Sequence, residues 1–65
     1  MTAEAIARLL EAHQVRPSYS RDGIRWACKT KGCDFSAATS ERAFRAEARH
    51  QSEVIVAAVA QEALA

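Results

Sequence analysis

The chain has 65 residues, of which 49% are hydrophobic, 26% charged and 6% aromatic, and its formal net charge at pH 7 is +1. This length suits one small domain spanning residues 1–65 and excludes the large enzyme folds. Alanine occupies 15 positions, and Val, Ile, Leu, Met and aromatic residues together occupy another 15. A core this small is worth only about 3–5 kcal/mol, so such domains usually need a disulfide, a metal or a partner chain.

The charges are unevenly distributed. Residues 21–49 carry seven positive and four negative side chains, whereas residues 50–65 carry two negative ones. No apolar run approaches the roughly 20 residues of a membrane-spanning helix, and Glu4 and Glu11 stand where a secretory signal would be basic or apolar. We therefore expect a cytoplasmic protein, in which two close cysteines more often form a metal site or redox pair than a structural disulfide.

The N-terminal segment, residues 1–16, is predicted to contain a short helix over residues 2–14. Thr2 is a suitable N-cap, and an apolar stripe with helical spacing follows and ends at His13. The other members of the stripe are Ile6, Leu9 and Leu10. Pro17 ends this helix, and residues 17–23 are rich in Ser, Asp and Gly, which is typical of a connector.

Residues 24–37 predict a β-hairpin whose turn carries both cysteines. Short strands at residues 24–27 and 34–37 flank the segment from Cys28 to Cys33, called here the knuckle. Gly32 suits the left-handed backbone of a tight turn.

Residues 39–64 predict one long helix, capped by Thr39 or Ser40, because they contain no Gly or Pro and are rich in Ala, Glu and Arg. One apolar face groups Phe44 with Ala48, Ile55, Ala58 and Val59; an adjoining stripe contains Ala43, Ala46, His50, Val54 and Ala57. The opposite face carries Arg42, Arg45 and Arg49. The predicted fold class is therefore α+β: a short helix, a knuckle hairpin and a long helix, in a finger-like αββα order.

The cysteines and histidines predict a metal site. Zinc takes four thiolate or imidazole ligands at tetrahedral corners, and Cys28 and Cys33 on a tight turn fit one edge. His50, on the helical face expected to meet the hairpin, is the third candidate, and His13, at the end of the apolar stripe, is the fourth. Glu47, Glu53 or a water are the alternatives for the fourth position. Ordinary buried thiols or a local disulfide are the alternatives to a metal.

Residues 24–50 resemble a classical Cys2His2 zinc finger. Trp26 stands two positions before the first cysteine, and the knuckle is followed by Phe35 in the second strand. The helix then supplies Phe44 as an apolar anchor and His50 as a histidine. The resemblance implies a zinc-stabilised domain with one Zn²⁺ per chain.

The chain departs from that family in two respects. Cys33 and His50 are separated by 16 residues, instead of the usual spacing of about 12. The second helical histidine is absent, because positions 54–56 are Val, Ile and Val. The four extra residues amount to about one helical turn, which keeps His50 on the same face of the helix. Because the second helical histidine is absent, His13 becomes the candidate for the fourth ligand.

The whole chain also resembles small zinc-finger-like proteins of actinobacteria and their phages. The shared features are a Trp-x-Cys element, a second nearby cysteine and a late helical histidine before an alanine-rich stretch. This resemblance implies a phage or actinobacterial origin, and the host cytoplasm as location if a phage encodes the chain.

A binding module that contacts another protein is the function we expect. Residues 54–60 are seven consecutive apolar residues that surround the helix, more than so small a domain can bury on one side. A homodimer or another protein partner would cover the surplus, with Val54, Ile55, Val56 and Val59 at the interface. The alternative is that this segment folds back on the N-terminal helix.

Weak DNA binding is the second candidate function. The contact residues would be Arg42, Arg45, Arg49, Lys29 and Lys31, on a nucleic-acid backbone. The expected i, i+4 pairs of Glu41 with Arg45 and of Arg49 with Glu53 would partly neutralise this face.

An enzyme is not expected, since the sequence has no catalytic motif and a site with four protein ligands leaves no open position. Thiol redox chemistry is a remote alternative, because the spacing of the cysteines is not Cys-x-x-Cys.

Overall fold

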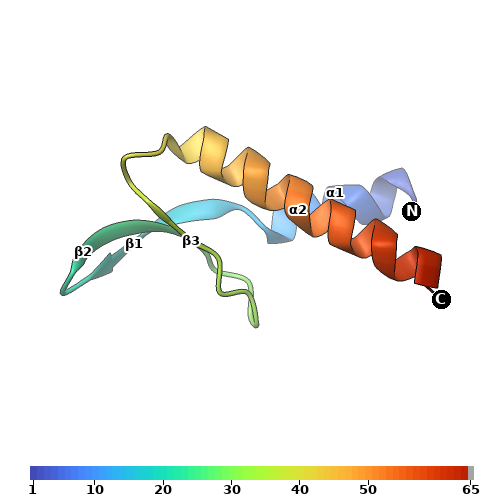
Figure 1. The fold of residues 1–65 in the computed structure, drawn as a ribbon, viewed down its shortest axis with the longest axis horizontal. Coiled ribbons are helices and arrows are strands. Elements are labelled where there is room, and N and C mark those ends of the chain that lie inside the picture. Colours follow the sequence, from blue (N-terminus) through green and yellow to red (C-terminus); the bar gives the residue numbers. More distant parts are fainter. Residues whose placement is uncertain (65) are drawn as a thin grey trace.

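The computed structural model describes residues 1–64, and Figure 1 shows their arrangement. The elements in chain order are α1 (Ala3–Ala12), β1 (Val15–Ser20), β2 (Gly23–Cys28), β3 (Ser36–Ala38) and α2 (Ala43–Leu64). The strands form one antiparallel sheet in the order β1-β2-β3. This confirms the predicted α+β class, with a short first helix, a strand hairpin and a long last helix.

The first hairpin, β1 with β2, was not predicted. The strands pair from Val15 opposite Cys28 to Ser20 opposite Gly23, and Gly23 has a φ of +116°, which closes the turn. The prediction that residues 17–23 form a connector was therefore wrong for most of that segment. Pro17 does not break the strand, because β1 is at the edge of the sheet, where a proline is tolerated.

The second hairpin, β2 with β3, carries the knuckle, as predicted, but its second strand is shorter and starts later. Trp26 lies opposite Ala37 in this pair. The backbone N–H of Cys28 donates to the carbonyl of Phe35 at 3.4 Å, so the hairpin closes just inside the knuckle.

The long helix α2 begins at Ala43, later than the predicted start at residue 39. The preceding residues form a turn in which the N–H of Glu41 donates to the carbonyl of Ala38 at 3.1 Å. The indole N–H of Trp26 donates to the carbonyl of Glu41 at 2.7 Å. This bond ties the start of α2 to the middle strand.

The core is small and lies between α2 and the sheet. Val15, Ala37 and Ala46 are buried, with Trp26 and Phe35 packed against them. Ala46 is 0% exposed, and its short side chain allows the helix to approach the sheet closely.

Phe44 corrects the predicted orientation of α2. It was expected to be the inward anchor of the helix, but it is 63% exposed. The inward face is instead the adjoining stripe that contains Ala46 and His50, the buried residues of this helix. Phe35, from the segment before β3, packs against the core, whereas Phe44 does not.

Helix α1 begins as predicted, with the Thr2 hydroxyl accepting from the N–H of Ala5 at 3.1 Å. It packs against α2, and none of its own residues is buried. At its C-terminal end, Gln51 donates to the carbonyl of Leu10 at 2.8 Å, and the Thr30 hydroxyl donates to the carbonyl of Ala12. Within residues 1–64, neither helix is both long and apolar enough to cross a membrane.

Candidate metal centre

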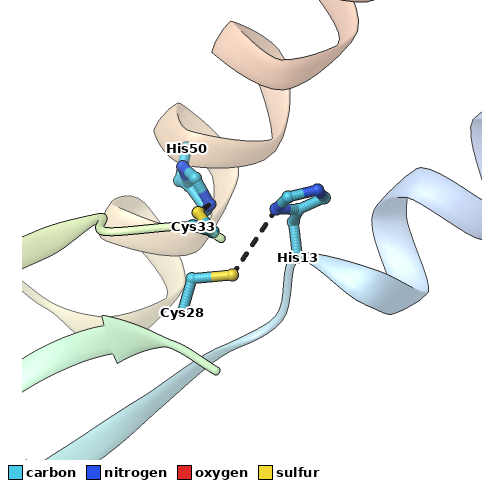
Figure 2. A group of neighbouring side chains, drawn as sticks. All are labelled: His13, Cys28, Cys33 and His50. Atoms are coloured by element: carbon cyan, nitrogen blue, oxygen red, sulfur yellow. Dashed lines mark hydrogen bonds between the residues drawn. The ribbon is translucent and has the colours of Figure 1, made fainter. Parts of the chain in front are cut away.

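Four side chains from separate segments converge at one point (Figure 2). His13 is the C-cap of α1, Cys28 ends β2, Cys33 ends the knuckle, and His50 lies on α2. Their ligand atoms all lie within 4.8 Å of one another. The structure thus brings together the four residues that the sequence analysis put forward as metal ligands.

Two distances within the group match edges of a tetrahedral zinc site. Nδ1 of His13 is 3.4 Å from Sγ of Cys28, and Nε2 of His50 is 3.4 Å from Sγ of Cys33. Zinc bonds of about 2.3 Å to sulfur and 2.0 Å to nitrogen place those corners about 3.5 Å apart. Each sulfur and its nearest imidazole nitrogen are therefore spaced as two ligands of one zinc ion would be.

The centre is partly enclosed. Cys28 and His50 are buried, whereas Cys33 and His13 are half-buried, and both cysteines are free thiols. Two thiols and two imidazoles are the donor set of structural zinc sites. The group is therefore compatible with a Cys2His2-like zinc site.

The knuckle holds Cys33 by local backbone geometry. Gly32 has a φ of +85°, and the N–H of Cys33 donates to the carbonyl of Thr30 at 3.0 Å. Burial raises the pKa of the Cys33 thiol, a backbone hydrogen bond from Phe35 lowers it, and the neighbouring Cys28 raises it. The balance is a raised pKa, so this thiol keeps its proton at neutral pH until a metal displaces it.

His50 is held between two rings. Phe35 stacks on its imidazole with ring centroids 4.2 Å apart and planes 19° apart, and His13 meets it edge-on at 5.2 Å. Burial lowers the pKa of His50, and its electrostatic interaction with His13 lowers it further. The neutral imidazole that a metal requires is therefore favoured.

The carboxylates considered for the fourth position lie outside the group. Glu47 accepts a hydrogen bond from the N–H of Val15 at 2.8 Å, and the same oxygen is 3.9 Å from Nη1 of Arg16. Neither Glu47 nor Glu53 joins the cluster found among the described residues. His13 is the fourth member of the group instead.

The basic residues are divided between two places. Arg49 pairs with Glu41 at 2.8 Å, and its guanidinium lies 5.7 Å from the centre of the Phe35 ring. This replaces the two i, i+4 pairs expected on the helix, because Glu41 precedes the first turn of α2. Lys29 and Lys31 belong to the knuckle, whereas Arg42 and Arg45 stand just before and within the first turn of α2. Figure 1 draws the knuckle loop at the bottom of the view and the start of α2 at the top.

The apolar segment of α2 is only partly covered. Val54 and Ile55 are half-buried, and α2 packs against α1. Val56 is 68% exposed and Val59 is 48% exposed. Folding back on α1 therefore covers part of the apolar surplus and leaves the rest at the surface.

Sequence reasoning missed several positioning residues. Phe35 was noted as an aromatic residue, but its stacking on His50 was not foreseen, nor were the hydrogen bonds of Thr30 and Gln51 to the end of α1. The polar character of Thr30 and Gln51 gave no signal that set them apart from surface residues.

Comparisons of the chain with models of protein families, with curated proteins and with solved structures found no match.

Proposed function

We propose that this chain is a non-enzymatic, zinc-stabilised binding module that contacts another protein. One Zn²⁺ is held by Cys28, Cys33, His50 and His13. The observation that supports the metal is the convergence of two thiols and two imidazoles within 4.8 Å, contributed by segments far apart in the sequence. With all four ligands in place the site has no free coordination position, as in structural zinc sites.

The small core makes the metal the dominant source of stability. Val15, Ala37 and Ala46 are its buried members, and two of them are alanines. A core of this size contributes about 3–5 kcal/mol, whereas structural zinc contributes about 10–16 kcal/mol to zinc-finger peptides at pH 7. Folding is therefore expected to depend on the ion.

Metal analysis of untagged protein, purified without chelator, tests the site. We expect one zinc per chain, and loss of helical circular dichroism on chelation that is restored when zinc is returned. His50→Ala should abolish both the metal and the fold. Full helicity in the presence of chelator would contradict the proposal.

Protein contact is supported by the exposed apolar side chains Val56 and Val59 on the second half of α2. The occupant we propose is a second copy of the chain, because like helices bury such faces against each other. Sedimentation velocity of the zinc-loaded chain should show a dimer, and V56E with V59E should return it to a monomer. Ile24→Glu is a matched control, since Ile24 is as exposed as Val59, at 48%, but lies on the β1–β2 hairpin. A monomeric wild type would contradict self-association.

Weak binding of DNA is the alternative, and Arg42 and Arg45 support it. Both are exposed, and no ion pair is found for either within residues 1–64. Affinity should fall steeply with salt and lack sequence preference, because only phosphates would be contacted. Fluorescence anisotropy of labelled DNA at low and physiological salt tests this, with Arg42→Ala plus Arg45→Ala as the variant.

The phage or actinobacterial origin implied by the resemblance stays a prediction.

A further inference from the structure

The four candidate ligands belong to two packing units of unequal strength. Cys28 and Cys33 lie on the sheet and its knuckle, and His50 lies on α2, which is packed on the sheet through the buried Ala46. His13 alone belongs to α1, as its C-cap. Three ligands are therefore fixed by the core, and the fourth depends on how α1 is held.

Helix α1 is held by few contacts besides His13. It has ten residues and no buried side chain, and its half-buried members are Ala5, Ile6 and Leu9. A helix of this length is not stable alone in water. Exposed hydrogen bonds from Gln51 and Thr30 reach its last turn, where water competes with them. The Cys28 thiol also lies 3.9 Å from the Ala12 carbonyl, a contact that its S–H would lose on binding a metal as thiolate. At the other end, the N-terminal amine of Met1 pairs with Glu62 of α2 at 3.0 Å.

A pivot lies next to His13. The backbone of His13 leaves the helix, with a φ of −106° and a ψ of 43°, and Gln14 joins it to β1. Val15 is fixed at once by its buried side chain and by the Glu47 carboxylate. The start of β1 is therefore anchored separately from α1, so α1 can move about residues 13–14 while β1 stays paired in the sheet.

We propose that α1 is a strap closed by the bond between His13 and the metal, and that it opens while the ion stays on Cys28, Cys33 and His50. Opening frees one coordination position, which accepts an external imidazole donor in place of His13. It also uncovers the half-buried side of α2 at Val54 and Ile55. This inference rests on the proposed zinc site.

The three remaining ligands suit this role because each is also held by contacts outside α1. The Cys28 N–H is bound to the carbonyl of Phe35, the Cys33 N–H to that of Thr30, and His50 is stacked on Phe35. Three protein ligands plus one exchangeable ligand is an established arrangement for zinc. His13, half-buried and next to the pivot, is the one positioned to exchange.

Hydrogen exchange of the zinc-loaded wild-type chain, followed by NMR, is the first test. Amides of α1 should exchange at least about tenfold faster than those in the middle of α2. Added imidazole should accelerate exchange in α1 while zinc stays bound and α2 stays protected. Equal protection of the two helices, or no response of α1 to imidazole, would overturn the strap.

The second test uses His13→Gly with Co²⁺ as a visible probe of the site. The variant should bind cobalt more weakly than wild type, and imidazole should restore the wild-type absorption spectrum while α1 remains unprotected. Gln51→Ala is the control, since it removes a hydrogen bond to α1 but no ligand; here α1 should keep more protection than in His13→Gly. Failure of His13→Gly to bind cobalt, or protection of α1 in that variant, would overturn the inference. Absence of metal from the wild-type chain would instead refute the proposed function.

Discussion

Phe35 lies almost parallel to the imidazole of His50, with ring centroids 4.2 Å apart and planes inclined by 19°. The contact joins the end of the knuckle to the middle of α2. It fixes the plane of a candidate ligand that is itself 5% exposed. A neighbour that orients a ligand affects metal affinity although it does not touch the metal.

Phe35→Ala should weaken zinc binding by about tenfold or more, because outer-shell partners typically contribute 10- to 100-fold. Competition with a chromophoric chelator measures the affinity. Phe44→Ala is the matched control, since Phe44 is exposed and should change stability by no more than about 0.5 kcal/mol. Equal effects of the two substitutions would contradict the role given to the stacking.

Removal of Glu47 should lower stability without changing the metal content. Its carboxylate accepts from the N–H of Val15 at 2.8 Å, and hydrogen bonds to charged groups contribute about 1.5–3 kcal/mol. Because the bond is only partly buried, we expect a loss near the lower end for Glu47→Ala, measured by urea denaturation of the zinc-loaded chain. Glu53→Ala, which removes an exposed carboxylate from the same helix, serves as the reference. A fall in zinc stoichiometry with Glu47→Ala would instead identify Glu47 as a ligand.

The two glycines with positive φ should differ in their effect on zinc. Gly32 lies in the knuckle with a φ of +85°, and Gly23 in the β1–β2 turn with a φ of +116°. A Cβ would meet no atom within 4 Å at either position, so the cost of Gly→Ala comes from the backbone alone, at about 1 kcal/mol or more. Both variants should be less stable, but only Gly32→Ala should also weaken zinc binding. Equal zinc affinities in titrations of the two variants would show that knuckle geometry does not control the site.

Zinc binding at pH 7.5 should release at least one proton, from Cys33. The raised pKa of this thiol keeps it protonated in the metal-free chain, whereas the lowered pKa of His50 favours a neutral imidazole that can bind through its unprotonated nitrogen without releasing a proton. The affinity should therefore fall as the pH falls, because protons compete for the thiolate. Calorimetry in buffers of different ionisation enthalpy counts the protons. Binding without proton release would show that the thiols are not the ligands.

The two helices and the hairpin that carries the knuckle were predictable, because the helices carry strong local signals. Thr2 caps the first helix, and the second contains no Gly or Pro. The strand β1 was missed because Pro17 is a local signal for a break, while its tolerance at an edge depends on the pairing of β1 with β2.

The ligand set was also within reach of the sequence, since a chain with two cysteines and two histidines offers few alternatives. The rotation of α2 about its own axis could not be predicted from the sequence. Alanines surround this helix, so apolar periodicity does not distinguish the face of Phe44 from that of His50. The face of α2 that turns toward the sheet is set by the close packing of Ala46 in the core and by Phe35, which comes from a different segment of the chain.

The knuckle also determines the order in which the chain can assemble. Four residues separate Cys28 from Cys33, whereas 16 separate Cys33 from His50. Closing the longer loop costs about 1.2 kcal/mol more, at about 0.6 kcal/mol for each doubling of length. If the proposed zinc binds, we therefore expect the two sulfurs to capture the ion first and the helices to pack onto a metal-loaded turn afterwards.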